Sequence, residues 1–184
     1  MIPPATPEYV QMASALCVDC RMCCDGTLFV GVIVHQGEED ALKALRPDIV
    51  FEDEGNVRIF CQPCPADSLA GCAIYATRPQ ECRTFDCQTL QALAAGRIDA
   101  SEARRRIDEV LDQRAQFMAT CGASNFNEAC QMVRQDEARC RSEGRALPQS
   151  AFEMLVLLRL IDLYLRPADE AMTMGGTDGK TADG

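Results

Sequence analysis

Cysteines are the residues of this chain whose type and spacing point most directly to chemistry. The sequence holds 12 cysteines and 1 histidine, and nine of the cysteines fall between Cys17 and Cys87. Several are separated by two residues, a spacing at which short segments supply neighbouring thiolates to a metal ion. With one histidine, zinc sites built on two or three histidines are excluded, so a metal site here must consist almost entirely of sulfur.

The first group of cysteines has the spacing Cys17-x2-Cys20-x2-Cys23-Cys24. On an α-helix, steps of about 100° place Cys17, Cys20 and Cys24 within an arc of roughly 60°. These three suit one metal centre, and Cys23 must then join another set of ligands unless the backbone turns there. A disulfide between the adjacent Cys23 and Cys24 is strained and is a poor alternative.

The second group contains Cys61-x2-Cys64-Pro65, followed by Cys72, Cys82 and Cys87. The first group matches the start of the ferredoxin run C-x2-C-x2-C-x3-C-P, and Cys64-Pro65 supplies a remote Cys-Pro, but the fourth spacing is absent. Metal binding is favoured over buried thiols acting as small hydrophobes and over a disulfide framework. Redox use of the Cys61–Cys64 pair lacks a thioredoxin-like βαβ context.

Composition limits which classes of protein and function remain possible. The chain has 184 residues, a formal charge of −10 and 47% hydrophobic residues, so it can bury a core. Net acidity without a basic run argues against nucleic-acid binding. The longest apolar stretch, Leu155–Leu165, includes Arg159 and Asp162 and is too short and too charged to cross a membrane. Since no signal peptide is recognisable, we expect a cytoplasmic protein with reduced thiols.

The expected elements fall into an α+β arrangement. Residues 1–10 are expected to be extended, 27–34, 49–51 and 57–60 to be strands, and 37–45 a helix, with Gly55-Asn56 at a hairpin turn inside an acidic run, Glu52-Asp53-Glu54. After Cys87 we expect a helix that stops near Gly96, a helix capped by Asp99 or Ser101, a helix opened by an Asn125/Glu128 capping box, and a helix over 151–166.

These elements suggest four parts of the chain. Residues 1–14 form an N-terminal extension, 15–90 a metal-organised cysteine-cluster module with a short antiparallel β element, 91–167 a helical region, and 168–184 a disordered tail. The helix Phe152–Leu165 is apolar almost all round, so we expect it to be the central helix of its region, with an oligomer or partner surface as the alternative.

The combined pattern resembles the YkgJ family of cysteine-cluster proteins, described as a zinc- or iron-chelating CxxCxxCC domain. The resemblance covers roughly residues 15–90 and rests on the first cysteine group, on Gly71-Cys72-Ala73-Ile74-Tyr75, and on Arg78-Pro79 with Cys82-Arg83-Thr84-Phe85-Asp86-Cys87. It implies eight metal ligands, Cys17, Cys20, Cys23, Cys24, Cys64, Cys72, Cys82 and Cys87. The family also resembles the iron–sulfur flagellin lysine N-methylases.

Residues outside the implied set have simpler interpretations. Cys61 is extra to the family pattern, and we interpret Cys121, Cys130 and Cys140 as core residues. His35 is a solvated or hydrogen-bonded side chain rather than a ligand. Arg21, Arg78 and Arg83 either offset thiolate charge or are ordinary surface arginines.

The function expected from the sequence is that of a cytosolic metal-binding protein. Its cofactor is zinc or iron, the latter including a 4Fe–4S cluster, held by the eight thiolates. The metal ion is the expected partner, with no nucleic acid and no membrane, and the sequence names no protein partner. Whether the chain is an enzyme stays open: the alternative is an iron–sulfur-dependent redox or protein-methylating enzyme, although no Gly-rich nucleoside loop is recognisable.

Overall fold

The computed structural model describes residues 7–54, 57–68 and 70–167, and these form the expected α+β fold. Its helices are α1 (Pro7–Cys20), α2 (Glu39–Leu45), α3 (Gln80–Thr84), α4 (Gln88–Ala94), α5 (Ala100–Cys121), α6 (Phe126–Ser142) and α7 (Gln149–Tyr164), with a 3-10 turn, η1, at Tyr75–Thr77. Its strands are β1 (Gly31–Val34), β2 (Glu52–Glu54), β3 (Val57–Cys61), β4 (Asp67–Ser68) and β5 (Gly71–Cys72).

The strands form two small antiparallel sheets. One has the order β1-β3-β2, with Gly31 opposite Cys61, and the other pairs β4 with β5, with Asp67 opposite Cys72. The predicted hairpin is confirmed, but its first strand is the acidic run itself. Asp53 lies opposite Arg58 and accepts a 2.9 Å hydrogen bond from its Nε, so the cross-strand ion pair lets the acidic residues form a strand. The expected turn residues lie outside the described part of the chain.

The strand expected over residues 27–34 begins only at Gly31. The preceding residues fold back on the end of α1, because the Thr27 N–H donates to Asp25 Oδ1 at 2.8 Å and the Leu28 N–H donates to the Met22 carbonyl at 2.9 Å. These local bonds replace the ladder that a longer strand would need.

The expectation of an extended N-terminus is wrong from Pro7 onward, where α1 begins. Proline is tolerated in the first turn of a helix because its missing N–H would have no partner there. Tyr9, Met12 and Leu16 pack this helix onto the larger core. Residues 1–6, and the predicted tail at 168–184, lie outside the described residues.

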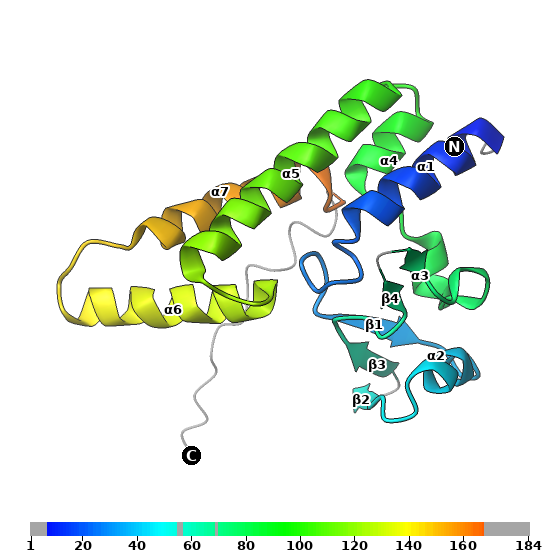
Figure 1. Ribbon diagram of the computed structural model, residues 1–184, viewed down its shortest axis with the longest axis horizontal. Coiled ribbons are helices and arrows are strands. Elements are labelled where there is room, and N and C mark those ends of the chain that lie inside the picture. The colour runs from blue at the N-terminus through cyan, green and yellow to red at the C-terminus, as the bar shows by residue number, and fades with distance from the viewer. Residues whose placement is uncertain (1–6, 55–56, 69, 168–184) are drawn as a thin grey trace, which may run out of the picture.

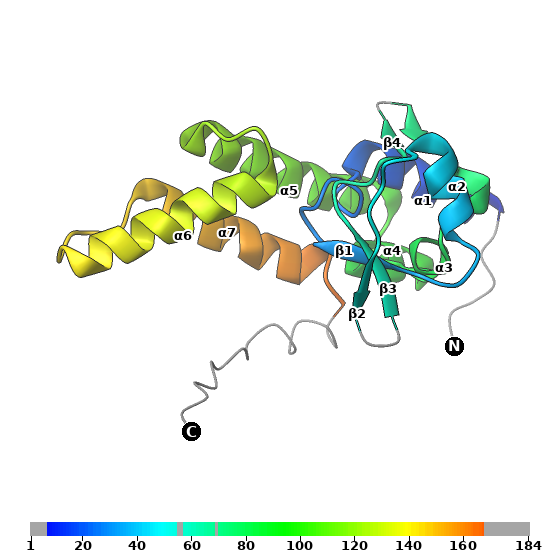
Figure 2. The same ribbon diagram turned by 90° about the horizontal axis from the view of Figure 1, so that it is seen from below.

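Two hydrophobic cores divide the molecule. The larger core combines residues from the N-terminal part of the chain, such as Leu16 and Met22, with residues of the later helices, such as Ile107 and Leu157. The smaller one lies under the three-stranded sheet and has five buried members, Val32, Val34, Leu42, Phe60 and Ala66. In Figures 1 and 2 the helices α5, α6 and α7 extend away from the end that carries the sheets.

One side of helix α7 is buried in the larger core, and the opposite side is exposed. Its residues Met154, Leu157 and Ile161 are buried, and α7 contacts α4, α5 and α6. Its opposite side exposes four large apolar side chains, Phe152, Leu155, Val156 and Leu163. No helix within the described ranges is long and apolar enough to cross a membrane.

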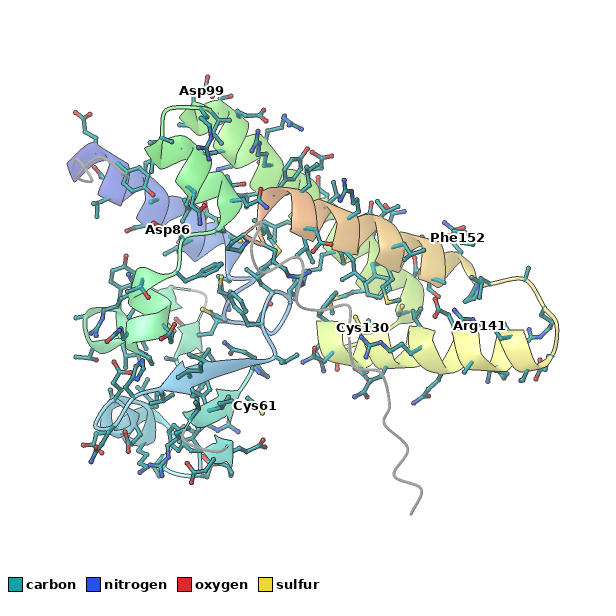
Figure 3. The ribbon with its side chains drawn as sticks, turned by 180° about the vertical axis from the view of Figure 1, so that it is seen from behind. Cys61, Asp86, Asp99, Cys130, Arg141 and Phe152 are labelled. Carbon is teal, nitrogen blue, oxygen red and sulfur yellow. The ribbon has the colours of Figure 1, made fainter. Side chains whose placement is uncertain are left out.

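The helix caps form largely as the sequence predicts. Asp99, labelled in Figure 3, is the N-cap of α5 and accepts a 2.8 Å hydrogen bond from the Glu102 N–H. Asn125 caps α6 by accepting from the Glu128 N–H at 2.9 Å. The Glu128 carboxylate returns to Ser124 rather than to Asn125, so the capping box is displaced by one residue.

We expect Asp99→Ala to lower the free energy of unfolding by about 1 kcal/mol, because the first turn of α5 loses its side-chain acceptor. Urea denaturation followed by circular dichroism measures this loss. Ser101→Ala is the matched control, since Ser101 lies inside the helix and leaves the Asp99 cap intact. Equal destabilisation by both substitutions would contradict the assignment of Asp99 as the cap.

Candidate metal centre

A backbone turn after α1 separates the two adjacent cysteines. The helix ends at Cys20, and Arg21 follows in the left-handed region with φ 54°. The Arg21 carbonyl then accepts from the N–H groups of Cys24 at 2.8 Å and Asp25 at 3.1 Å. Because the chain turns here, Cys17, Cys20 and Cys24 do not share one helix face; the alternative of a backbone turn is what the structure shows.

The first thiol group consists of Cys17, Cys20, Cys23 and Cys87. Cys20, Cys23 and Cys87 all contact the larger core, beside the end of α1 and the start of α4. Cys17 is exposed at the surface and Cys20 is half-buried. Desolvation by the surrounding protein raises the pKa of Cys17 to about 11 and that of Cys20 to about 12, and the charge of Cys87 raises both pKa values further. Burial also raises the pKa of Cys23 well above its usual value, with Cys20, Cys87, Cys24 and Cys17 adding to the effect.

Cys87 is held in this group by the far end of α7. It is the N-cap residue of α4, and the N–H of the next residue, Gln88, donates to the Leu165 carbonyl at 3.1 Å. The Gln88 side chain donates to the carbonyls of Asp162, in the last turn of α7, and Arg166, just after the helix. The helical region therefore fixes the position of a cysteine that is 64 residues or more from the other members in sequence.

The second thiol group consists of Cys24, Cys64, Cys72 and Cys82. Cys64, Cys72 and Cys82 all contact the smaller core. The Cys64 N–H donates to the Cys24 carbonyl at 2.7 Å, and Gln62 Nε2 donates to the Cys23 carbonyl at 2.8 Å, so the segment after β3 docks on the turn after α1. Cys72 is brought in by β5, and Cys82 by α3.

Burial is the main cause of the raised pKa values in this group as well. It raises the pKa of Cys24 to about 12, and the charges of Cys64, Cys82 and Cys72 contribute, together with Asp67. It raises the pKa of Cys82 to about 11, with Cys64 and Cys72 adding to the effect. Thiols that disfavour each other's ionisation in a buried place need a cation before they can all be thiolates.

Arginines accompany both groups. The Arg21 guanidinium binds the Asp67 carboxylate through Nε at 2.8 Å and Nη2 at 2.6 Å, a bidentate pair beside Cys24 and Cys64. The Arg78 guanidinium lies 4.0 Å from the centroid of the Tyr75 ring, and its buried Nε has no hydrogen-bond partner. Arg83 is directed to Glu38, with 3.5 Å between Nη2 and Oε1.

The remaining candidates lie elsewhere or have structural roles. Cys61, labelled on β3 in Figure 3, lies 3.8 Å from the Glu52 carboxylate and in neither thiol group. His35 Nε2 lies 3.2 Å from Glu81 Oε1 at the surface, as expected for a hydrogen-bonded histidine. Cys140 is buried, and Cys121 and Cys130 pack against the larger core, which agrees with their interpretation as core residues.

The thiols are grouped but are not arranged as a coordination sphere. Across the described ranges, no three Cys, His, Asp or Glu side chains are placed to hold a metal ion. The eight cysteines of the two groups are free thiols. A cysteine has one side-chain rotation, about χ1, so its sulfur can change direction without movement of the backbone. Helix geometry predicts that Cys24 shares a group with Cys17 and Cys20, and this is wrong: because of the turn at Arg21, Cys23 stays with them and Cys24 joins the second group.

Comparison with known proteins gives little similarity. No protein-family model matches the chain, and no solved structure matches it. A curated protein, the probable pyridoxal 5'-phosphate synthase subunit pdx-1 of Neurospora crassa, is 29% identical over 94 residues, which are 50% of this chain and 30% of that protein. The chain thus spans less than a third of the length of this relative, and a match of that extent does not place the chain in its family.

Proposed function

We propose that the protein binds two metal centres, each through four cysteine thiolates. The observation that carries the proposal is the division of eight cysteines into two groups of four from segments far apart in sequence, with three members of each group packed against its own core and Cys17 and Cys24 beside them. Four thiolates are the full ligand set of a tetrahedral zinc site and of a 4Fe–4S cluster. The resemblance to the YkgJ family supports the same eight residues.

The donor chemistry fits such centres. In each group the thiols lie in protein surroundings that raise the pKa of most of them, so that without a cation they stay protonated. A dication reverses this preference and displaces the protons. The Arg78 guanidinium, whose buried Nε has no hydrogen-bond partner, provides a donor and positive charge beside the groups.

The simplest role of these centres is structural. The first group joins α1 to the start of α4, and the second joins the turn after α1 to β3, β5 and α3. Metal ligation would therefore fasten the loops between residues 61 and 87, which contain only strands of two residues and helices of five or fewer. Such segments bury too little apolar surface to hold their conformation alone.

Element analysis of protein purified without oxygen tests this function, together with its visible spectrum. A colourless protein with about two zinc ions per chain would support two tetrahedral sites. A brown protein with iron and acid-labile sulfide would support clusters in the same positions. Less than about one metal equivalent per chain, with all cysteines titrating as free thiols, would overturn the proposal.

A further inference from the structure

Arg78 lies in the short connection between η1 and α3 and is held there by contact with the Tyr75 ring. It directly follows η1 and precedes α3, and its guanidinium carbon lies 4.0 Å from the centroid of the Tyr75 ring. The Tyr75 hydroxyl is in turn 2.9 Å from Ser14 Oγ, on α1. Ser14 is one turn before Cys17, so this contact places Arg78 against the helix that carries the first group.

Arg78 lies close to members of both groups: the Tyr75 ring that it contacts is hydrogen-bonded to Ser14, three residues before Cys17, and α3, which carries Cys82, begins two residues after Arg78. The charge of Arg78 opposes the effect of burial on the pKa of Cys17, in the first group, and on that of Cys82, in the second. Its charge also opposes the rise that burial causes in the pKa of Asp86, which is labelled in Figure 3 and lies in the segment that joins α3 to Cys87. Arg21, by comparison, is engaged with Asp67 in a bidentate pair, and Arg83 is directed to Glu38.

The Nε of Arg78 is buried without a hydrogen-bond acceptor. A buried donor of a charged group that is left unpaired lowers the stability of the fold, so an acceptor is expected in the working protein. Metal-bound thiolates are such acceptors, and a dication held by four of them carries a net charge of about −2. Hydrogen bonds to ligand sulfurs are the usual way in which a protein holds and tunes such a site.

We propose that Arg78 is a positioning residue shared by the two metal centres, donating its buried Nε–H to a ligand sulfur and balancing the negative charge of both. This inference rests on the proposed function. It implies that the two centres are coupled, because one cation compensates two anionic sites that already meet at the Cys23–Cys24 peptide. Loss of Arg78 must then weaken both.

The test measures zinc release from the protein loaded with two zinc ions, using 4-(2-pyridylazo)resorcinol as the chromogenic acceptor. We expect Arg78→Gln to release both equivalents about tenfold faster or more, the range for loss of a residue that orients metal ligands. Arg78→Lys keeps the charge but not the planar Nε donor, and should recover part of the loss. The matched control is Arg83→Gln, five residues further along the same motif and paired with Glu38, which should release zinc at the rate of the unmodified protein.

Cobalt substitution supplies a readout that a merely structural role would not move. The thiolate-to-cobalt charge-transfer bands should shift in Arg78→Gln while far-ultraviolet circular dichroism stays unchanged. Acceleration of only one zinc equivalent, or equal acceleration by Arg83→Gln, would overturn the shared role. Absence of zinc from the unmodified protein would instead overturn the proposed function, so the two failures are distinguishable.

Discussion

Removal of the proposed metal ions is expected to unfold the two sheets while α5, α6 and α7 stay folded. The smaller core has five buried members, and three of the four second-group thiols pack directly against it. Structural zinc supplies about 10–16 kcal/mol to the folding of small zinc modules. The larger core instead runs continuously through α1, α4, α5, α6 and α7, and does not depend on a ligand for its apolar burial.

Hydrogen exchange read by mass spectrometry checks this expectation. After treatment with a strong chelator and a reductant, amides of β1, β3 and the β4–β5 hairpin should exchange at nearly the rate of an unfolded chain. Amides of α5 and α7 should keep their protection, and the same chelator saturated with zinc beforehand serves as the control. Unchanged protection in the sheets after complete metal loss would show that their side-chain packing is sufficient.

The two thiol groups should respond differently to this treatment. In the first group Cys20, Cys23 and Cys87 contact the larger core, and Cys87 is fixed by the bonds between Gln88 and the end of α7. In the second group Cys72 and Cys82 lie on a two-residue strand and a five-residue helix. Loss of protection should therefore be greatest between residues 61 and 84, where the proposed metal ligation would replace apolar packing as the source of order.

The local features of this fold were accessible from sequence, and the site was accessible only in part. Asp99 and Asn125 cap helices through bonds to the N–H three residues later, so the information lies within one turn. The eight thiols were identified by spacing and resemblance. Their division was not, because it depends on the positive φ of Arg21 and on bonds such as Cys64 N–H to the Cys24 carbonyl, which joins residues 40 apart.

The other differences between the sequence-based predictions and the structure also arise from contacts between residues far apart in the chain or from very short elements. The strands β4 and β5 have two residues each, too few to show an alternating pattern in sequence. The acidic run at β2 became a strand because Arg58 pairs with Asp53 across the sheet, against the low strand preference of acidic residues. The position of Arg78 depends on a contact between Tyr75 and Ser14, which are 61 residues apart. Each is a tertiary effect that local propensity does not contain.

The division predicts that the adjacent residues Cys23 and Cys24 are each required for a different one of the two proposed metal centres. We expect Cys23→Ser to empty the first group and Cys24→Ser the second, each reducing the bound zinc from about two equivalents to about one, since a tetrahedral site that loses a thiolate binds much more weakly. Cys140→Ser, a buried cysteine of α6 outside both groups, is the control and should retain both equivalents.

Double substitutions test the division, because the amount of zinc lost depends on whether the two cysteines belong to one group or to both. Cys24 and Cys64 belong to one group, so replacing both should cost no more metal than replacing either, whereas replacing Cys23 and Cys64 should remove both equivalents. Zinc content measured on folded, anaerobically purified variants, with circular dichroism as the check on folding, distinguishes the two patterns. If Cys23→Ser combined with Cys24→Ser removed only one equivalent, the adjacent thiols would share a centre, and the turn at Arg21 would not separate them. We expect the double substitution to remove both equivalents, because Cys23 packs against the larger core whereas Cys24 is joined to the smaller one through the hydrogen bond from the Cys64 N–H.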